Sequence, residues 1–202
     1  DMKTGAPAFG TPENTRANIA GGQLAWFYKP PFRTSACSAS NAADAQAVWE
    51  TQMALWGAVT GHGNLVYHAA GWGEGGLVAD FEKLVIDCEM LQAMAAMLRP
   101  VGFDTADFGF SAHDEVDPGG HFFGTAHTME RYQDAFYAPF LSDWSNHENW
   151  RDAGSKTATT RAMALWPRML DAYTLPPMDA GRIEEMQAYI AHRKEQIGSD
   201  TP

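Results

Sequence analysis

The sequence contains little cysteine and little positive charge, and both shortages narrow the possible functions. Cys37 and Cys88 fall at an expected strand end and in an expected helix, where buried free thiols are favoured over a disulfide. Such thiols are typical of a reducing cytoplasm, the compartment that we expect. Only 14 Lys and Arg oppose 25 Asp and Glu, and the net charge of −11 argues against a nucleic-acid-binding surface.

Long apolar runs and the common cofactor motifs are also missing. No run approaches the roughly 18 apolar residues of a membrane-spanning helix, so no membrane segment is predicted. The sequence lacks a P-loop, a GxGxxG fingerprint and an HExxH motif, and no two of its histidines are four residues apart, so no metal site is predicted. What remains is a globular composition, with 45% hydrophobic and 19% charged residues in 202.

Expected strands recur along the chain, and each is followed by an expected helix. The strands cover residues 6–9, 32–39 and 65–67, and a fourth strand end is expected at 121–127. The helices cover 12–28, a stretch capped by Ser40 or Asn41 that runs to about residue 60, and 81–98. A repeat of about 30 residues is that of a βα unit, so the pattern predicts an α/β fold with a parallel sheet or barrel.

The end of the chain has a different pattern. We expect a short helix or irregular segment over 104–116 and a helix from Thr128 to about Phe140. Two more helices are expected over 157–173, with a kink at Pro167, and over 178–197. We therefore divide a single domain into four βα units in residues 1–140 and a helical C-terminal extension in residues 141–202. This amphipathic extension suits packing around a barrel or a subunit interface, so a homo-oligomer is expected.

The stretch from Asn64 to Gly76, NLVYHAAGWGEGG, is the main candidate for a site. Its strand, glycine-rich turn and following helix form a βα unit, in which ligands bind at the C-terminal end of the strand. His68 and Glu74 are candidate catalytic residues, and the indole face of Trp72 could bind a quaternary ammonium group. The alternatives are a core histidine, a solvated glutamate and a tryptophan that covers packed helices.

Two further groups of residues are candidates. His121 follows Gly119 and Gly120, where glycine permits a close approach of the backbone to a ligand. Other polar residues follow the second expected strand, and the first turn of its helix could face the mouth of a barrel. Asn41 is equally suited to cap that helix. These candidate substrate-binding residues are Ser38, Asn41, Asp44 and Gln46.

Several long motifs together resemble a known family. DMKTGAPAFGTPE, SASNAADAQA, NLVYHAAGWGEGGL, FEKLVIDCEML and DPGGHFFGTAHT, in this order and spacing, are similar to the C-terminal half of the trimethylamine methyltransferase family. The resemblance implies the C-terminal half of a TIM (β/α)8 barrel, with the helical extension behind it. We interpret the sequence as one that begins inside a longer protein.

The resemblance also implies a reaction. Members of this family move a methyl group from a methylated amine to the Co(I) corrinoid (cobalamin) of a separate corrinoid protein. The founding members use pyrrolysine, and because every residue here is a standard amino acid, a quaternary amine such as a betaine is expected. Trp72 or Phe123 would hold the ammonium group while His121 or His68 binds the rest of the substrate. No tightly bound cofactor is expected in this chain.

Two other functions stay open at this point. A different TIM-barrel enzyme, such as a lyase, could use Glu74 and His121 for proton transfer. A non-catalytic half-barrel could instead serve as a module for assembly or for docking of the corrinoid protein.

Overall fold

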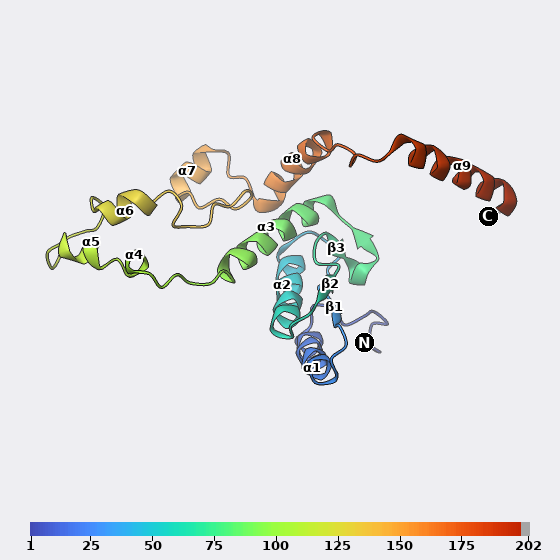
Figure 1. Cartoon of the computed structure of the whole chain (residues 1–202), viewed down its shortest axis with the longest axis horizontal. Coiled ribbons are helices and arrows are strands. Elements are labelled where there is room, and N and C mark those ends of the chain that lie inside the picture. Colours follow the sequence, from blue (N-terminus) through green and yellow to red (C-terminus); the bar gives the residue numbers. More distant parts are fainter. Residues whose placement is uncertain (199–202) are drawn as a thin grey trace. The chain divides into compact units, whose positions relative to one another are not determined.

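The computed structural model describes residues 1–198 and contains a parallel β-α-β unit (Figure 1). After α1 (Pro12–Tyr28), the unit consists of β1 (Arg33–Ser35), α2 (Ala45–Thr60) and β2 (Leu65–Tyr67), and α3 (Phe81–Met97) follows it. β1 and β2 pair in parallel, with Arg33 opposite Leu65 and Ser35 opposite Tyr67. The prediction of an α/β unit with parallel strands is thus confirmed, although the strands of residues 1–198 form no closed barrel.

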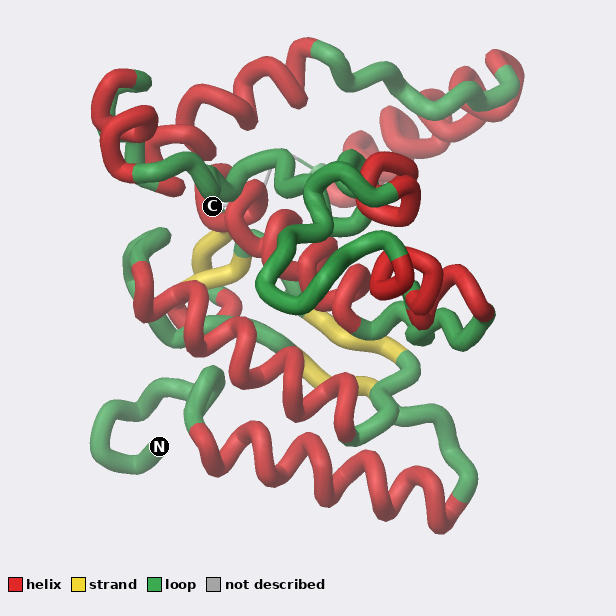
Figure 2. Tube along the Cα trace, turned by 90° about the vertical axis from the view of Figure 1, so that its left-hand side faces the viewer, coloured by secondary structure: helices red, strands yellow, loops and turns green. Residues whose placement is uncertain are grey.

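The helices α1, α2 and α3 pack in parallel, as consecutive helices of βα units do. On α1, Thr15 faces Gly57 of α2, and one turn further Asn18 and Gly22 face Gly61. Figure 2 shows α1 and α2 side by side. From α2 to α3 the same order holds, because the early part of α2 meets the early part of α3 and the later parts meet each other. Val48 packs against the cluster that contains Val85 and Ile86, the Lys83 ammonium donates to the Thr51 hydroxyl, and Leu55 shares a cluster with Met94.

A small antiparallel hairpin separates β2 from α3. It consists of β3 (Trp72–Gly73), the 3-10 turn η1 (Glu74–Gly76) and β4 (Val78–Ala79). Gly71, Gly75 and Gly76 all have positive φ, which explains why the turn needs so many glycines. Asp80 then caps α3, because its carboxylate accepts a hydrogen bond from the Lys83 amide.

The segment after α3 contains four short helices. They are α4 (Thr105–Phe108), α5 (Phe110–Asp114), α6 (Ala126–Arg131) and α7 (His147–Asp152). The chain beyond α6 is attached to α3 by Glu89, whose buried carboxylate accepts hydrogen bonds from the Phe140 amide at 2.9 Å and the Leu141 amide at 2.7 Å. The Arg161 guanidinium then donates to the Leu141 carbonyl oxygen at 2.8 Å.

The last two helices are α8 (Ala158–Asp171) and α9 (Ala180–Ile197). The chain forms two compact units, Asp1–Pro167 and Arg168–Pro202. In the first unit, Trp166 stacks on Phe81 with ring centroids 4.9 Å apart and donates its indole N–H to Glu82 at 2.9 Å. Within residues 1–198 no helix has both the length and the apolar content needed to cross a bilayer.

The structure corrects several boundaries. The predicted strands at 6–9 and 121–127 are wrong, because no strand of residues 1–198 lies beside either stretch to share backbone hydrogen bonds, and the second expected strand is only three residues long. The Thr125 side chain accepts from the Thr128 amide, so Thr125 caps α6, and that helix ends at Arg131 instead of Phe140. Two of the four predicted strands therefore pair in the described chain. The division at residue 140 stays a prediction.

The contact between α1 and α2 gives a first testable prediction. A Cβ atom on Gly22 would collide with the backbone carbonyl of Gly61, which cannot move away without shifting α2. We expect Gly22→Ala to lower the free energy of unfolding in urea by about 1–3 kcal/mol. Gly21→Ala is the control, because its methyl would meet only the Phe32 ring at 3.0 Å. Equal stability of the two variants would contradict this packing.

Candidate functional site

The segment after β1 and the turn after β2 are joined by backbone hydrogen bonds. The Ala36 amide donates to Tyr67 at 2.9 Å, and the Ser38 amide donates to Trp72 at 3.4 Å. In the opposite direction, the amides of Glu74 and Gly75 donate to the carbonyl oxygens of Ser40 and Ser38, both at 2.9 Å. The structure therefore brings together, at the carboxyl ends of the two parallel strands, the two loops in which most of the candidate residues were predicted.

His68 and Trp72 form one part of this site. The Nδ1 atom of His68 lies 3.2 Å from the Ser35 hydroxyl, and its ring meets the Trp72 ring edge-on with centroids 4.9 Å apart. Both side chains are half-buried, and His68 has a positive φ of 54°. Its other ring nitrogen, Nε2, has no hydrogen-bond partner among residues 1–198. A ring fixed through Nδ1 with Nε2 free has the arrangement needed to contact a ligand.

Glu50, which sequence reasoning did not select, organises the loop after β1. Its Oε2 atom accepts hydrogen bonds from the Ser38 hydroxyl and the Ala39 amide, both at 2.8 Å, and from the Ser40 amide at 3.0 Å. Its Oε1 atom accepts from the Gln46 side chain at 2.9 Å. The four-residue spacing of Gln46 and Glu50 on one helix face was the only sequence signal.

An acidic pocket of about 640 Å³ lies beside this loop. Asn41, Glu50 and Glu74 contribute its polar side chains at the strand ends, and Phe9 and Leu77 contribute apolar walls. No lysine or arginine is among its described lining residues. The carboxylates of Asp1, Glu50 and Glu74 line the pocket without a lysine or arginine among them, and such an excess of acidic side chains favours a cationic ligand.

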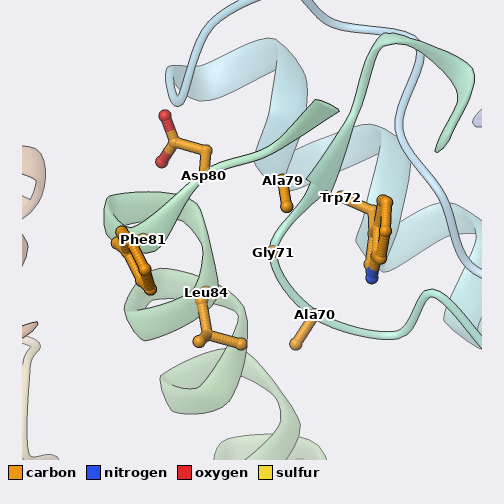
Figure 3. Close-up of a pocket in the computed structure, with 7 residues that line it drawn as sticks. All are labelled: Ala70, Gly71, Trp72, Ala79, Asp80, Phe81 and Leu84. Carbon is orange, nitrogen blue, oxygen red and sulfur yellow. The ribbon is translucent and has the colours of Figure 1, made fainter. Parts of the chain in front are cut away.

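A smaller apolar pocket of about 170 Å³ lies between the turn and α3 (Figure 3). Phe81 and Leu84 of α3 line one side, and Ala70 and Gly71 line the other. In Figure 3 the ring of Trp72 points away from Phe81 and Leu84. These aromatic rings therefore do not form a common cage around this pocket.

A buried cluster of charged side chains on α3 is hydrogen-bonded to the turn after β2. The Lys83 ammonium lies 2.5 Å from Asp87 Oδ2 and donates to the Thr51 hydroxyl at 2.9 Å, while Asp87 Oδ2 also accepts from the Gly71 amide at 2.8 Å. Burial raises the pKa of Asp87, and the charge of Lys83 opposes that rise. Sequence reasoning missed the pair, because a Lys and an Asp four residues apart on a helix are usually exposed.

The remaining predicted residues have different surroundings. Asp44 caps α2, because its carboxylate accepts from the Gln46 and Ala47 amides; the prediction that Ser40 or Asn41 is the cap is therefore wrong. Asp44, Gln46, Asn41 and Glu74 are all exposed. His121 and Phe123 are exposed and face each other with ring centroids 5.0 Å apart. No hydrogen bond or ring contact within residues 1–198 joins them to the loops at the strand ends, and their roles stay predictions.

Both cysteines are free thiols, as predicted, although only Cys37 is fully buried and Cys88 is half-buried. The Cys37 sulfur lies 3.4 Å from the Ser38 carbonyl oxygen and 3.9 Å from that of Trp72, inside the contact between the two loops. Burial raises the pKa of Cys37 to about 11. Among the described residues, no three His, Cys, Asp or Glu side chains converge as metal ligands would.

Comparison with known proteins identifies the family. The sequence profile of the family described as "Trimethylamine methyltransferase (MTTB)" matches residues 1–198. The chain belongs to the trimethylamine methyltransferase family.

This member of the trimethylamine methyltransferase family is similar in sequence to several named methyltransferases. It is 33% identical over 201 residues to the glycine betaine methyltransferase of Desulfitobacterium hafniense (strain Y51), covering 99% of the chain and 42% of the relative. It is 25% identical to the trimethylamine methyltransferase MttB of D. hafniense (strain DSM 10664 / DCB-2), covering 98% and 40%. The MttB protein of Methanosarcina barkeri (strain Fusaro / DSM 804) is 28% identical, with 94% and 38% covered. The chain thus spans about two fifths of the length of these relatives.

The contacts of Glu50 give a second prediction. Glu50→Ala leaves the Ala39 amide without its acceptor and removes one of the two acceptors of the Ser40 amide, which also donates to the Ser38 hydroxyl at 2.9 Å. We expect the free energy of unfolding to fall by about 1–3 kcal/mol. Glu50→Gln retains an acceptor oxygen and should lose less. Glu130→Ala is the control, because it removes only an exposed ion pair with Arg131. Urea denaturation of the three variants measures the difference, and a loss for Glu50→Ala no greater than that of the control would refute the anchoring role.

The thiol of Cys37 gives a third prediction, on pH dependence. Because its pKa rises on folding from 9.0 to about 11, the folded state holds the proton more tightly than the unfolded state. The resulting stabilisation is complete below pH 9 and is lost as the pH rises towards 11. We expect the free energy of unfolding to fall more steeply over this range in the wild type than in Cys37→Ala. If the free energy of unfolding falls equally with pH in both proteins, the pKa of the thiol does not change on folding, and the prediction is wrong.

Proposed function

We propose that the protein to which this chain belongs transfers a methyl group from a quaternary methylated amine to the Co(I) corrinoid of a partner protein. Family membership supports a methyltransferase. The observation that favours a quaternary amine is the pocket at the strand ends, where Glu50 and Glu74 supply negative charge and no lysine or arginine lines the pocket. The 33% identity to a glycine betaine methyltransferase, against 25% and 28% to the two trimethylamine methyltransferases, supports the same choice.

We also propose that the chain forms the C-terminal half of a TIM (β/α)8 barrel. The parallel pairing of β1 and β2 and the parallel packing of α1, α2 and α3 support this architecture. In such barrels the ligand site lies at the carboxyl ends of the strands, which is where the acidic pocket, His68 and Trp72 lie. The remaining strands would complete the wall of the site.

The reaction needs alignment more than proton transfer. Co(I) donates an electron pair to the methyl carbon, a Co–C bond forms, and the C–N bond breaks with its electrons staying on nitrogen. A quaternary ammonium therefore leaves as a neutral tertiary amine and needs no proton. The main tasks of the enzyme are to hold the ammonium group and to place its methyl carbon in line with cobalt.

Three side chains of the described site are suited to the first task. Glu50 and Glu74 line the acidic pocket and attract the positive charge, while Trp72, which lines the small apolar pocket on the same turn, offers a ring face for a cation–π contact of about 0.5–2 kcal/mol. Next to Trp72, His68 is oriented by Ser35 and has Nε2 free to donate to an anionic group elsewhere on the substrate. In this proposal His68 is a binding residue.

The lyase alternative has no comparable support. It requires Glu74 and His121 to act on one substrate, but Glu74 lines the acidic pocket and His121 does not. Within the described residues, the ring contact of His121 is with Phe123.

A spectroscopic assay tests the proposal. The full-length protein is mixed with cob(I)alamin and either glycine betaine or trimethylamine, and formation of methylcobalamin is followed. We expect product with the quaternary amine. Trp72→Leu should raise KM by about 2- to 30-fold, as expected for the loss of one cation–π contact.

Trp49→Leu is the matched control, since Trp49 is an exposed tryptophan on α2 that lines neither the acidic pocket nor the small apolar pocket to which Trp72 belongs. Its kinetics should equal those of the wild type. Failure of every methylated amine to yield methylcobalamin would refute the reaction. Equal effects of the Trp72 and Trp49 substitutions would refute the assignment of Trp72.

A further inference from the structure

Residues 7–9, which the proposed mechanism does not use, line one side of the acidic pocket. Among the described residues that line this pocket, Phe9 is the only aromatic one, and it is half-buried. Trp72 lines the small apolar pocket instead. The acidic pocket therefore has an aromatic ring of its own, next to the carboxylates of Glu50 and Glu74.

The turn that carries Phe9 is packed against Glu50. The Thr11 hydroxyl donates to the Ala8 carbonyl oxygen at 2.9 Å, which closes the turn. Gly10 has a positive φ of 72°, and a Cβ atom on this residue would collide with the Glu50 side chain. Because only glycine fits here, the backbone next to Phe9 lies directly on the glutamate that organises the loop after β1.

The ring of Phe9 lies beside the turn that carries Glu74. Its Cδ2 atom is 3.9 Å from the position that a Cβ atom on Gly75 would take. Glu74 is exposed and takes part in no ion pair within residues 1–198. Its φ of 50° is unusual for a residue other than glycine, and such positions are typical of functional sites. The ring is thus adjacent to the residue that follows an unpaired carboxylate.

An aromatic ring among carboxylates suits one class of cation. A metal ion needs several oxygen ligands, and a primary ammonium group needs hydrogen-bond acceptors, but a phenyl ring supplies neither. A methylated ammonium group donates no hydrogen bond when it is quaternary, and its charge is attracted both to carboxylates and to the face of an aromatic ring. The combination of groups therefore favours a quaternary ammonium ion.

We propose that Phe9 contacts the trimethylammonium group of the substrate with its ring, while Glu50 and Glu74 supply the opposite charge. This contact would make the pocket selective for a methylated cation over an uncharged molecule of the same shape. The inference rests on the proposed function, because it concerns the same pocket and the same class of substrate. It adds to that site a residue from the segment before α1.

Two ligands of equal shape test the role of Phe9 in the full-length protein. Glycine betaine carries a trimethylammonium group, and tert-butylacetate has the same shape and carboxylate, with carbon in place of the charged nitrogen. The Kd of glycine betaine is measured by isothermal titration calorimetry without corrinoid, and that of tert-butylacetate by competition. In Phe9→Leu we expect the Kd of glycine betaine to rise by about 2- to 30-fold, as for the loss of one cation–π contact.

The same substitution should change the Kd of tert-butylacetate much less, because leucine replaces the apolar contact but not the cation–π contact. Phe9→Tyr keeps an aromatic face and should restore the wild-type Kd of glycine betaine. Phe27→Leu is the matched control, since Phe27 is an exposed phenylalanine on α1 that lines neither pocket. A variant that is merely misfolded would weaken both ligands alike.

Three results would overturn the proposal. They are an unchanged Kd of glycine betaine in Phe9→Leu, an equal loss of affinity for both ligands, and a wild-type protein that does not bind glycine betaine. The proposed reaction is tested separately, because no corrinoid is present in this experiment. If Phe9 is needed to bind glycine betaine and no methylcobalamin forms in the spectroscopic assay, the reaction is refuted and the role of Phe9 in binding stands.

Discussion

The buried ion pair between Lys83 and Asp87 connects three parts of the structure. Lys83 and Asp87 belong to α3, Thr51 belongs to α2, and Gly71 lies in the turn that carries Trp72. Removing two charges from water costs several kcal/mol per ion unless each finds good partners. Here the ammonium has two oxygen acceptors and Asp87 Oδ2 has two donors, while the buried Oδ1 atom of Asp87 has no hydrogen-bond partner within the described residues. The same cluster therefore holds Gly71 in place and joins α2 to α3.

The same principle recurs at two other carboxylates. Glu50 of α2 accepts the amides of the loop after β1, and Glu89 of α3 accepts the amides of Phe140 and Leu141. In all three cases a helix provides an acid, and an irregular segment provides backbone N–H groups that would otherwise lack a partner. Hydrogen bonds between an ionised acceptor and an amide are among the stronger ones in proteins. Some of the many acidic residues of this chain therefore hold loops in position.

These anchors explain how a site can form on loops. Ser38, Trp72 and Glu74 lie on segments with little regular structure, yet each segment is bonded to a carboxylate or to the neighbouring loop. The proposed methyl transfer would depend on the alignment of a methyl carbon and would require such rigidity. α9 differs from this region, because none of its residues is buried within the described chain.

The sequence by itself determined the parallel β-α-β unit, the main helices and the family. Apolar periodicity, caps and glycines are local signals, and they predicted α1, β2 and α3 to within a residue or two. A strand also needs a neighbour to accept its hydrogen bonds, which is why 6–9 and 121–127 had the composition of strands without becoming strands. Only the tertiary structure decided that Lys83 and Asp87 are buried, that the half-buried Glu50 anchors the loop after β1, and that Asp44 is a cap. The hydrogen-bond partners of these side chains lie in other helices or are backbone amides of loops. A local sequence pattern does not predict which carboxylate will bind which of these donors.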